Sequence, residues 1–248
     1  MVIPAHPLAL DAERRFDARR QRALTRYYLD AGAGGLAVGV HSTQFAIREK
    51  GLYAPVLRAA AETVRDGTGA AGVPVRPVWP VLMIAGLAGR TAQAVAEAWI
   101  ACGEGYHAGM LSLAAMKGAS IDELIEHCRA VAGVMPLVGF YLQPAVGGIA
   151  LPDVFWQRFA EIENVVAIKI APFDRYRTLD VVRGVVAARA EERVTLYTGN
   201  DDHIVLDLLQ PFVVKRVNGR TEETVTVHIR GGLLGHWSVW THTAVALF

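Results

Sequence analysis

The strongest constraint on this chain is an alternation of two kinds of segment along its length. Short apolar runs rich in Val, Ile and Leu are each followed by a longer stretch with helical periodicity. Short continuous apolar strands that alternate with helices indicate a parallel sheet with helices packed on it. The six clear apolar runs are Leu36–Val40, Val81–Ala85, Gly109–Leu113, Leu137–Tyr141, Val165–Ile170 and Val194–Tyr197.

Amphipathic stretches separate these runs and predict helices. Some begin with residues that favour a helix start, because Ser120 and Glu123 have the spacing of a capping box and Pro152 suits a first turn. The predicted helical stretches are Phe16–Ala31, Ala46–Val64, Thr91–Cys102, Ile121–Val131, Pro152–Ile162, Thr178–Ala190 and Asp202–Leu209.

The number of strand–helix units predicts the fold. A weaker first strand at Val2–His6 and an eighth at Thr224–Ile229, followed by a helix near His236, bring the number of units to eight. Eight units in 248 residues is the size of a (β/α)8 TIM barrel. The alternative is an open doubly wound sheet, which normally carries a glycine-rich phosphate motif that this sequence lacks. We therefore expect an α/β fold with one TIM-barrel domain over residues 1–248.

Composition argues against several classes of function. The chain has 25 Lys and Arg against 24 Asp and Glu, and this balance argues against a nucleic-acid-binding protein, which needs a basic face. Its two cysteines, Cys102 and Cys128, are far apart and suggest no disulfide framework, so we expect a cytoplasmic protein. No apolar run approaches the roughly 18 residues that a membrane span needs, so we expect no membrane partner.

The use of lysine singles out one position. Only four of the 25 basic residues are lysines, and one of them, Lys169, lies inside an apolar strand. Burial lowers the pKa of a lysine and makes its neutral amine available for Schiff-base chemistry. The structural alternative is a strand-end lysine that reaches water or pairs with a carboxylate. Tyr141 ends the preceding strand, where it is either a proton relay or a rim tyrosine with its hydroxyl in water.

In a TIM barrel, catalytic residues lie at the C-terminal ends of the strands. The side chains that we expect there include Tyr141, Lys169 and several polar residues. The remaining positions at these strand ends are His6, His41, Ser42, Ala85, Gly86, Leu113 to Ala115, Gly199, Asn200 and Asp201.

Three segments carry a family resemblance. Gly35–Phe45, Phe140–Pro144 and Asn164–Lys169 resemble, in order and spacing, three segments of one family: Gly-Thr-Thr-Gly-Glu after strand two, Tyr-Asn-x-Pro after strand five and Asn-Ile-x-Gly-Ile-Lys on strand six. This family is the dihydrodipicolinate synthase / N-acetylneuraminate lyase family of class I aldolases, and the chain resembles a divergent member of it. The similarity covers about residues 2–210.

The resemblance implies a mechanism. Lys169 would form an imine with a pyruvate-like 2-oxo acid, and Tyr141 would relay protons. His41 and Ser42 would hold the substrate carboxylate where the family has a Thr-Thr pair. The segment Tyr197–His203 is similar to the family's segment after strand seven, which implies that Gly199 and Asn200 bind substrate. The reaction makes or breaks a carbon–carbon bond, needs no metal or other cofactor, and implies a homodimer or homotetramer.

The chain also departs from this family. Val146 stands where dihydrodipicolinate synthases carry an arginine for the aldehyde's carboxylate, so we do not expect true dihydrodipicolinate synthase activity. Arg175 is a candidate to replace that arginine, although it is equally well placed to lie in a helix-capping loop that begins at Asp174. Members of the family usually continue with further helices, whereas this chain stops inside the apolar stretch Thr241–Phe248. We therefore expect the C-terminal helices to be short or missing.

Two other functions stay open on the sequence alone. A metal-dependent barrel hydrolase or aldolase would use His6, His41, Asp201 and His203, which are residue types that bind divalent metals. A relative that binds a small acid without catalysis is the other alternative, because the Thr-Thr pair is altered.

The last part of the chain gives weaker predictions. We expect an extra hairpin within residues 211–235 before strand eight. The segment Gly231–Trp237 is interpreted as a glycine-rich tight turn, and Trp237 and Trp240 are expected on one face of a helix.

Overall fold

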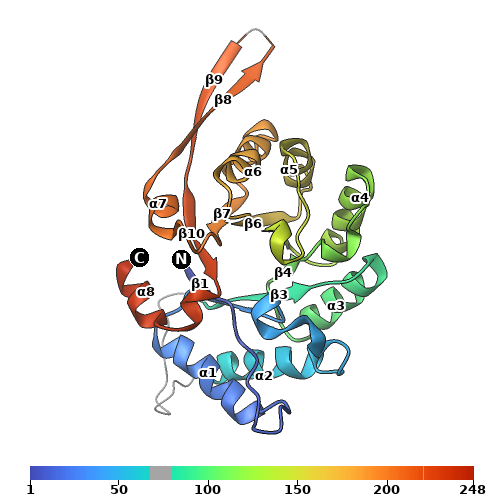
Figure 1. Cartoon of the computed structure of the whole chain (residues 1–248), viewed down its shortest axis with the longest axis vertical. Helices are drawn as coiled ribbons and strands as arrows, with labels where there is room; N and C mark the ends of the chain where they lie inside the picture. The colour runs from blue at the N-terminus through green and yellow to red at the C-terminus, as the bar shows by residue number, and fades with distance from the viewer. Residues whose placement is uncertain (68–79, 220) are drawn as a thin grey trace. The chain divides into compact units, whose positions relative to one another are not determined.

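The computed structural model describes residues 1–67, 80–219 and 221–248. One sheet has eight strands in the order β1-β10-β7-β6-β5-β4-β3-β2, and a second sheet is the hairpin β8-β9. Figure 1 shows these elements along the chain. The strands are β1 (Val2–Pro4), β2 (Gly35–Val38), β3 (Leu82–Leu87), β4 (Ala108–Leu111), β5 (Leu137–Leu142), β6 (Val165–Ala171), β7 (Thr195–Thr198), β8 (Phe212–Asn218), β9 (Thr221–Val227) and β10 (Ile229–Leu234).

The larger sheet has the pairing of a barrel. The strands pair in parallel between β2 and β3, β5 and β6, β6 and β7, and β7 and β10. The two strands at the ends of the order, β1 and β2, are joined where Ala5 pairs in parallel with Ala37 and the His6 amide donates to the Ala37 carbonyl at 2.8 Å. The fold is therefore the (β/α)8 barrel that the sequence predicts.

Most helices begin close to their predicted positions, but the predicted start at Ala46 was wrong, because Phe45–Ile47 is a 3-10 turn and α2 begins at Tyr53. Helix α4 carries the predicted capping box of Ser120 and Glu123. Helix α6 begins at Arg175 rather than at Thr178, because the Asp174 carboxylate accepts hydrogen bonds from the first free backbone amides of the helix. The helices are α1 (Ala18–Asp30), α2 (Tyr53–Asp66), α3 (Thr91–Gly103), α4 (Ile121–Ala132), α5 (Asp153–Ala160), α6 (Arg175–Ala187), α7 (Ile204–Leu209) and α8 (Thr241–Leu247).

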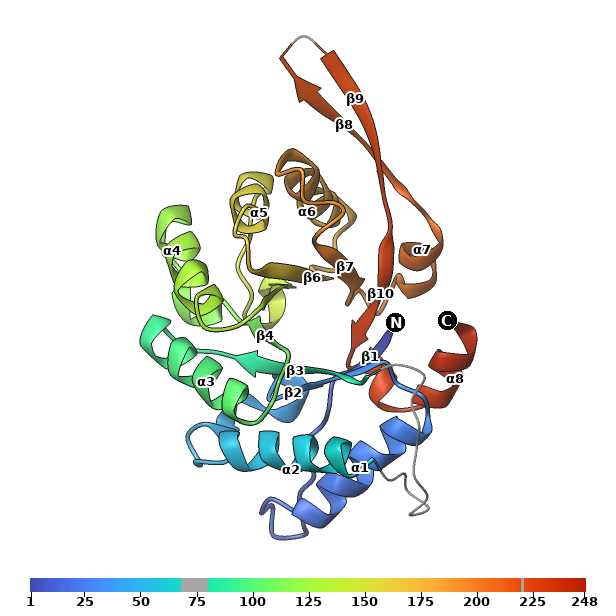
Figure 2. The ribbon, with the colours of Figure 1, turned by 180° about the vertical axis from the view of Figure 1, so that it is seen from behind.

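Contacts group the chain into two compact units. The first comprises Met1–Leu87, Ala96–Met110 and Leu233–Phe248, and the second comprises Ala88–Val95 and Leu111–Gly232. In the first unit, α1 and α2 lie side by side (Figure 2). In the second unit, α5 and α6 pack against each other beside β6 and β7 (Figure 1). A single domain over residues 1–248 stays a prediction.

The core of the second unit is aromatic. Phe155, Trp156 and Phe159 of α5 are buried and in ring contact with one another. Glycine lets strand β5 approach them, because a Cβ atom at Gly139 would lie 2.7 Å from the Phe159 ring. This packing shows that Gly139 faces the helices, and it fixes the direction of every other residue on β5.

The predicted eighth strand was wrong in position. Residues Thr224–Ile229 mostly belong to β9, which pairs antiparallel with β8 as the long hairpin in Figure 1. The eighth barrel strand is β10, Ile229–Leu234, so the prediction of a tight turn at Gly231–Trp237 was also wrong. The sequence Thr-Val-Thr-Val alternates, as a hairpin with one exposed face should, whereas the barrel strand is nearly all buried.

The two C-terminal tryptophans do not share a helix face. Trp237 is buried in a short 3-10 turn at His236–Ser238. Trp240 precedes α8 with a left-handed backbone, φ 53°, and its side chain is exposed. Among the described residues, no helix is both long and apolar enough to cross a membrane.

Candidate active site

Lys169 lies near the C-terminal end of β6, in a strand whose neighbouring side chains are buried. It pairs in register with Phe140 of β5 and Tyr197 of β7, and paired residues of parallel strands point to the same face. Its ammonium nitrogen lies 4.7 Å from the centroid of the Phe140 ring. Because Gly139 faces the helices, Phe140, Lys169 and Tyr197 face the barrel interior.

The amine of Lys169 is desolvated although the residue is partly accessible to solvent. Burial lowers its pKa from 10.5 to about 8, and the nearby charge of Asp201 opposes this shift. A lowered pKa makes the neutral, nucleophilic amine available near neutral pH. An accessible but poorly hydrated amine is what imine formation with a carbonyl compound requires.

Gly199 provides the space in which this lysine lies. A Cβ atom at Gly199 would be 2.6 Å from Cε of Lys169 and 2.8 Å from Cβ of Ala171. The Gly199 amide donates to the carbonyl of Ile170 at 2.7 Å, which holds the end of β7 close to β6. Gly199 therefore lies beside Lys169, and the contact that the structure shows is with the lysine. Its predicted contact with substrate stays a prediction.

Tyr141 points away from Lys169. It follows Phe140 on β5 and therefore faces the helices, where its ring lies 5.1 Å from the ring of Trp156. Its hydroxyl donates to the Leu151 carbonyl and accepts from the Leu151 amide, both at 3.2 Å. Burial raises the pKa of this phenol. These contacts fix the loop after β5, whereas the catalytic role implied by the resemblance stays a prediction.

Tyr197 is a residue that the sequence analysis missed. It is buried on the face of Lys169, and burial raises the pKa of its phenol. Within the described residues its hydroxyl has no hydrogen-bond partner, whereas the other buried tyrosine hydroxyls donate to backbone carbonyls. Those tyrosines are Tyr28, Tyr53, Tyr106 and Tyr141. The signal that identifies Tyr197 is strand register, which requires knowing which residues of neighbouring strands are paired.

Asn200 and Arg175 belong to a polar network around a buried carboxylate. Asp207 of α7 is fully buried and accepts hydrogen bonds from Thr198 Oγ1 at 2.6 Å and Asn200 Nδ2 at 3.1 Å. Arg175 forms an ion pair with the other oxygen of Asp207. Asn200 Oδ1 in turn accepts from the Phe173 amide at 3.0 Å.

This network fixes the side chains of Arg175 and Asn200. Arg175 pairs with the buried Asp207 through Nη1, while its side chain is 41% exposed. The amide of Asn200 joins the loops that follow β6 and β7, on either side of Lys169. The predicted role of these two residues in binding substrate stays a prediction.

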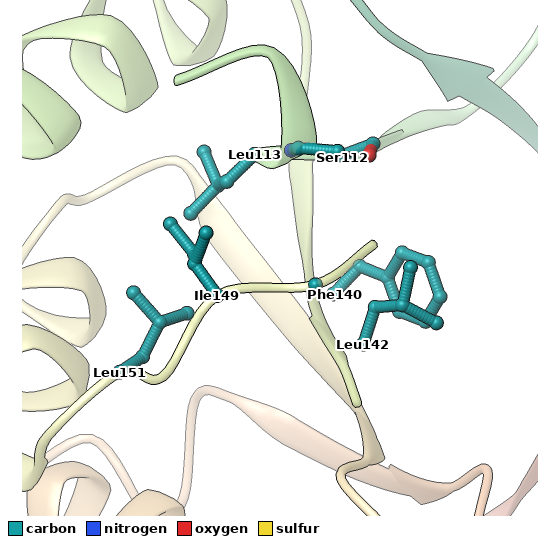
Figure 3. Close-up of a pocket in the computed structure, with 8 residues that line it drawn as sticks. Ser112, Leu113, Phe140, Leu142, Ile149 and Leu151 are labelled. Carbon is teal, nitrogen blue, oxygen red and sulfur yellow. Dashed lines mark hydrogen bonds between the residues drawn. The ribbon is translucent and has the colours of Figure 1, made fainter. Parts of the chain in front are cut away.

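A pocket lies at the ends of β4 and β5 (Figure 3). Its lining comes from the segment after β4, from β5 and from the loop after β5. In Figure 3, Leu113 and Ile149 point toward each other, and Phe140 and Leu142 point the opposite way. Phe140, which carries the Lys169 amine on its ring, also lines this pocket. The full lining is Ser112, Leu113, Ala114, Phe140, Leu142, Gly148, Ile149 and Leu151.

His41 and Ser42 lie in the first unit, in a short 3-10 turn after β2. The His41 ring stacks on Phe45, with 5.8 Å between centroids. The next residue, Thr43, is buried and holds this turn, because its hydroxyl donates to the His6 carbonyl at 2.6 Å. The predicted role of His41 and Ser42 in holding a carboxylate stays a prediction.

The geometry does not support the metal alternative. His6 is fully buried, and its Nε2 lies 2.9 Å from Thr25 Oγ1 while its Nδ1 lies 2.9 Å from Gln21 Nε2. Burial lowers its pKa to about 4, so the ring is neutral and both nitrogens are occupied. In the part of the chain that the structure describes, no three His, Cys, Asp or Glu side chains are grouped so that they could hold a metal ion.

Comparisons with known proteins show the fold. Neither the protein-family models nor the curated proteins contain a match. Among solved structures, a putative dihydrodipicolinate synthetase from Pseudomonas aeruginosa has a TM-score of 0.74 and 18% identity, covering 96% of this chain and 71% of that one. The dihydrodipicolinate synthase from Acinetobacter baumannii complexed with pyruvate has a TM-score of 0.77 and 18% identity, covering 99% and 73%.

A third similar structure comes from a prophage protein of Escherichia coli K12 that belongs to the dihydrodipicolinic acid synthase family and was solved in complex with pyruvate. Its TM-score is 0.78 at 18% identity, and the match covers 99% of this chain and 73% of that one. The solved structures thus confirm the barrel, and they are the kind of protein that the sequence motifs resemble.

Proposed function

We propose that this protein is a Schiff-base lyase in which Lys169 forms an imine with a pyruvate-like 2-oxo acid and makes or breaks a carbon–carbon bond. The observation that carries the proposal is the desolvated Lys169 amine, which faces the barrel interior beside Phe140 and above Gly199. Barrel enzymes place their chemistry at this end of the strands. Solved structures with the same fold include two complexes with pyruvate, which supports the choice of substrate.

The proposed reaction begins with the neutral amine of Lys169. Its lone pair attacks C2 of the 2-oxo acid, the oxygen leaves as water, and a protonated imine remains. The imine withdraws electrons, so C3 can lose a proton or a carbon substituent and form an enamine. Addition of water to the imine at the end of the cycle releases the product and restores the amine.

Each cycle needs a group that holds and returns protons. We propose that Tyr197 is this group, because it shares the face of Lys169 and its buried phenol stays protonated at neutral pH. Tyr141, the residue that the resemblance implies, would instead position the loop that borders the pocket. General acid–base groups contribute about 10²–10⁴-fold to rate, so the two assignments are separable by single substitutions.

Trapping with borohydride tests the function. The protein is incubated with pyruvate, reduced with sodium borohydride, and digested for peptide mass mapping. We expect a reduced pyruvate adduct on Lys169, its loss in Lys169→Ala, and its retention in Lys117→Ala, which removes an exposed lysine. The absence of a reduced pyruvate adduct on the protein would contradict the proposal. Activity that survives Lys169→Ala but is lost with a chelator would favour the metal-dependent alternative.

The proton relay is tested by a matched pair of variants. Tyr197→Phe should slow turnover of the 2-oxo acid by about 10²-fold or more, while Tyr141→Phe removes only the two bonds to Leu151. A larger loss in Tyr141→Phe than in Tyr197→Phe would reverse the assignment. Ligand binding without turnover in the unsubstituted protein would favour the non-catalytic alternative.

We also propose that the protein works in the cytoplasm as a homodimer or homotetramer. Both cysteines, Cys102 and Cys128, are free thiols, which suits a reducing compartment. The exposed Trp99 of α3 is a large apolar side chain of the kind enriched at subunit interfaces. Light scattering coupled to size exclusion measures the mass in solution, and a monomer at micromolar concentration would contradict the oligomer.

A further inference from the structure

Helix α7 buries its charged residue and exposes its apolar ones. Its only charged side chain, Asp207, is fully buried and pairs with Arg175. Its exposed side chains are all aliphatic, namely Val205, Leu206 and Leu209, and the last of these is 73% exposed. A surface helix of a globular protein normally shows the opposite arrangement, with apolar side chains inside and polar ones in water. The exposed side of α7 is therefore suited to contact with another protein surface.

The hairpin β8–β9 extends this apolar surface. One face of the hairpin packs on α6, where Phe212 is buried and Arg216 donates to the carbonyl of Val186 at 3.0 Å. Successive side chains of a strand point to opposite faces, so Val213 and Val217 point away from α6, and they are 64% and 68% exposed. In both views α7 lies at the base of the hairpin, on the side away from α6 (Figures 1 and 2). We define the α7–hairpin surface as the exposed side chains of Val205, Leu206, Leu209, Val213 and Val217.

The outer face of the hairpin carries one cation and one anion. Lys215 and Glu222 form an exposed ion pair at 2.7 Å, and their side chains are 69% and 58% accessible. The other positions of this face are uncharged, and they are Val213, Val217, Thr224 and Thr226. Such a face is complementary to itself, because a two-fold axis can place Lys215 of one copy opposite Glu222 of the other, and symmetry repeats the contact. A strongly acidic or basic partner would repel one of the two charges, so the charge pattern favours a second copy of this chain.

We propose that two copies of this chain associate through their α7–hairpin surfaces as an isologous dimer. Association removes the exposed aliphatic side chains of both copies from water, which is the driving force. Lys215 and Glu222 of each copy then pair with Glu222 and Lys215 of the other. The inference rests on the proposed homo-oligomer and names its contact surface, and it is independent of the chemistry of Lys169.

Charge reversal tests whether the surface contacts a copy of itself. Lys215→Glu gives the outer face two anions, and Glu222→Lys gives it two cations. Each single variant should weaken self-association by about tenfold or more, because like charges then face each other. An equimolar mixture of the two single variants should recover the affinity, as should the double variant Lys215→Glu/Glu222→Lys, because opposite charges meet again. Sedimentation-velocity ultracentrifugation measures the dissociation constant in each case.

The apolar part of the surface is tested by a second substitution. Leu209→Asp places a charge on the exposed side of α7 and should raise the dissociation constant of self-association by about tenfold or more. Arg129→Glu reverses an exposed charge on α4, outside the α7–hairpin surface, and should leave the dissociation constant unchanged. Equal dissociation constants in Leu209→Asp and Arg129→Glu would overturn the inference.

The combined results separate this inference from the proposals above. A monomeric unsubstituted protein overturns both the homo-oligomer and its contact surface. An oligomer that persists unchanged in Lys215→Glu, Glu222→Lys and Leu209→Asp overturns the surface alone. Weakened single variants whose mixture stays weak also overturn it, because the two surfaces then do not face each other. The borohydride adduct on Lys169 reports the Schiff-base function independently of all these outcomes.

Discussion

The reactivity of Lys169 depends on a competition among its neighbours. The face of the Phe140 ring, 4.7 Å away, and the charge of Asp201 both favour the ammonium form. Burial favours the neutral amine, and it outweighs them because the pKa falls from 10.5 to about 8. A lysine in the same strand but with a hydrated amine would be almost fully protonated at neutral pH and a poor nucleophile.

The pH dependence of imine formation follows from this pKa. The neutral amine is the reacting form, so the second-order rate constant with pyruvate should rise through pH 8 and level off above it. At pH 7 about a tenth of the protein would carry the neutral amine. Stopped-flow or quenched trapping between pH 6 and pH 10 measures this profile. A rate that still rises tenfold per pH unit up to pH 10 would contradict a lowered pKa.

Gly199 should matter more for activity than for folding. In Gly199→Ala the new methyl group would meet Cε of Lys169 at 2.6 Å, and the flexible lysine chain can swing aside. We expect a cost of about 1–2 kcal/mol in the free energy of unfolding and a loss of about tenfold or more in trapping rate. Gly103→Ala, where a Cβ has open space, is the control. Full activity in Gly199→Ala would show that the lysine does not need this space.

At the scale of secondary-structure elements, polar side chains of α6 and α7 hold the loops that follow β6 and β7. Helix α6 begins at Arg175 because Asp174 caps it, and Arg175 then reaches the buried Asp207 of α7. These bonds tie together the loops that follow β6 and β7. The first-turn cap was predictable from Asp174 alone, whereas the pairing of Arg175 with a residue of another helix was not.

Another arginine joins a helix end to a strand. The guanidinium of Arg193 donates to the backbone carbonyls of Ala160, Glu163 and Val165, between the end of α5 and the start of β6. Arg193→Ala should leave these carbonyls with fewer donors and lower the free energy of unfolding by about 2–3 kcal/mol. Urea titration measures the loss. Arg183→Ala removes an exposed side chain of α6 and should change the free energy of unfolding by less than about 0.5 kcal/mol. Equal losses in both variants would contradict the role of Arg193 in stability.

For the whole molecule, periodicity was sufficient to predict the barrel and the strand that carries Lys169. Periodicity failed to place the eighth barrel strand. Thr224–Ile229 has the sequence of a strand but mostly pairs in the hairpin, and the barrel strand that follows it contains glycines. The environment of the site was less predictable. The sequence places Tyr141 next to Lys169 along the strand ends, but only the register of β5, β6 and β7 shows that Tyr197 shares its face.

A buried amine should make the whole molecule less stable at neutral pH. The unfolded chain binds a proton at Lys169 up to about pH 10.5, whereas the folded chain releases it near pH 8. Below pH 8 the destabilisation is therefore complete, and it disappears as the pH rises to 10.5. At pH 7 we expect the free energy of unfolding of Lys169→Met to exceed that of the unsubstituted protein by about 1–3 kcal/mol. This difference should shrink as the pH rises toward 10.5. Equal urea midpoints of the two proteins at pH 7 would contradict this account. So would a difference between their stabilities that does not change with pH.

The most direct test of the central claim is a crystal structure of the protein soaked with pyruvate. The account predicts continuous electron density between Nζ of Lys169 and C2 of the ligand, with the ligand beside the ring of Phe140. Pyruvate bound without a covalent link to Lys169, or joined to another lysine, would contradict it.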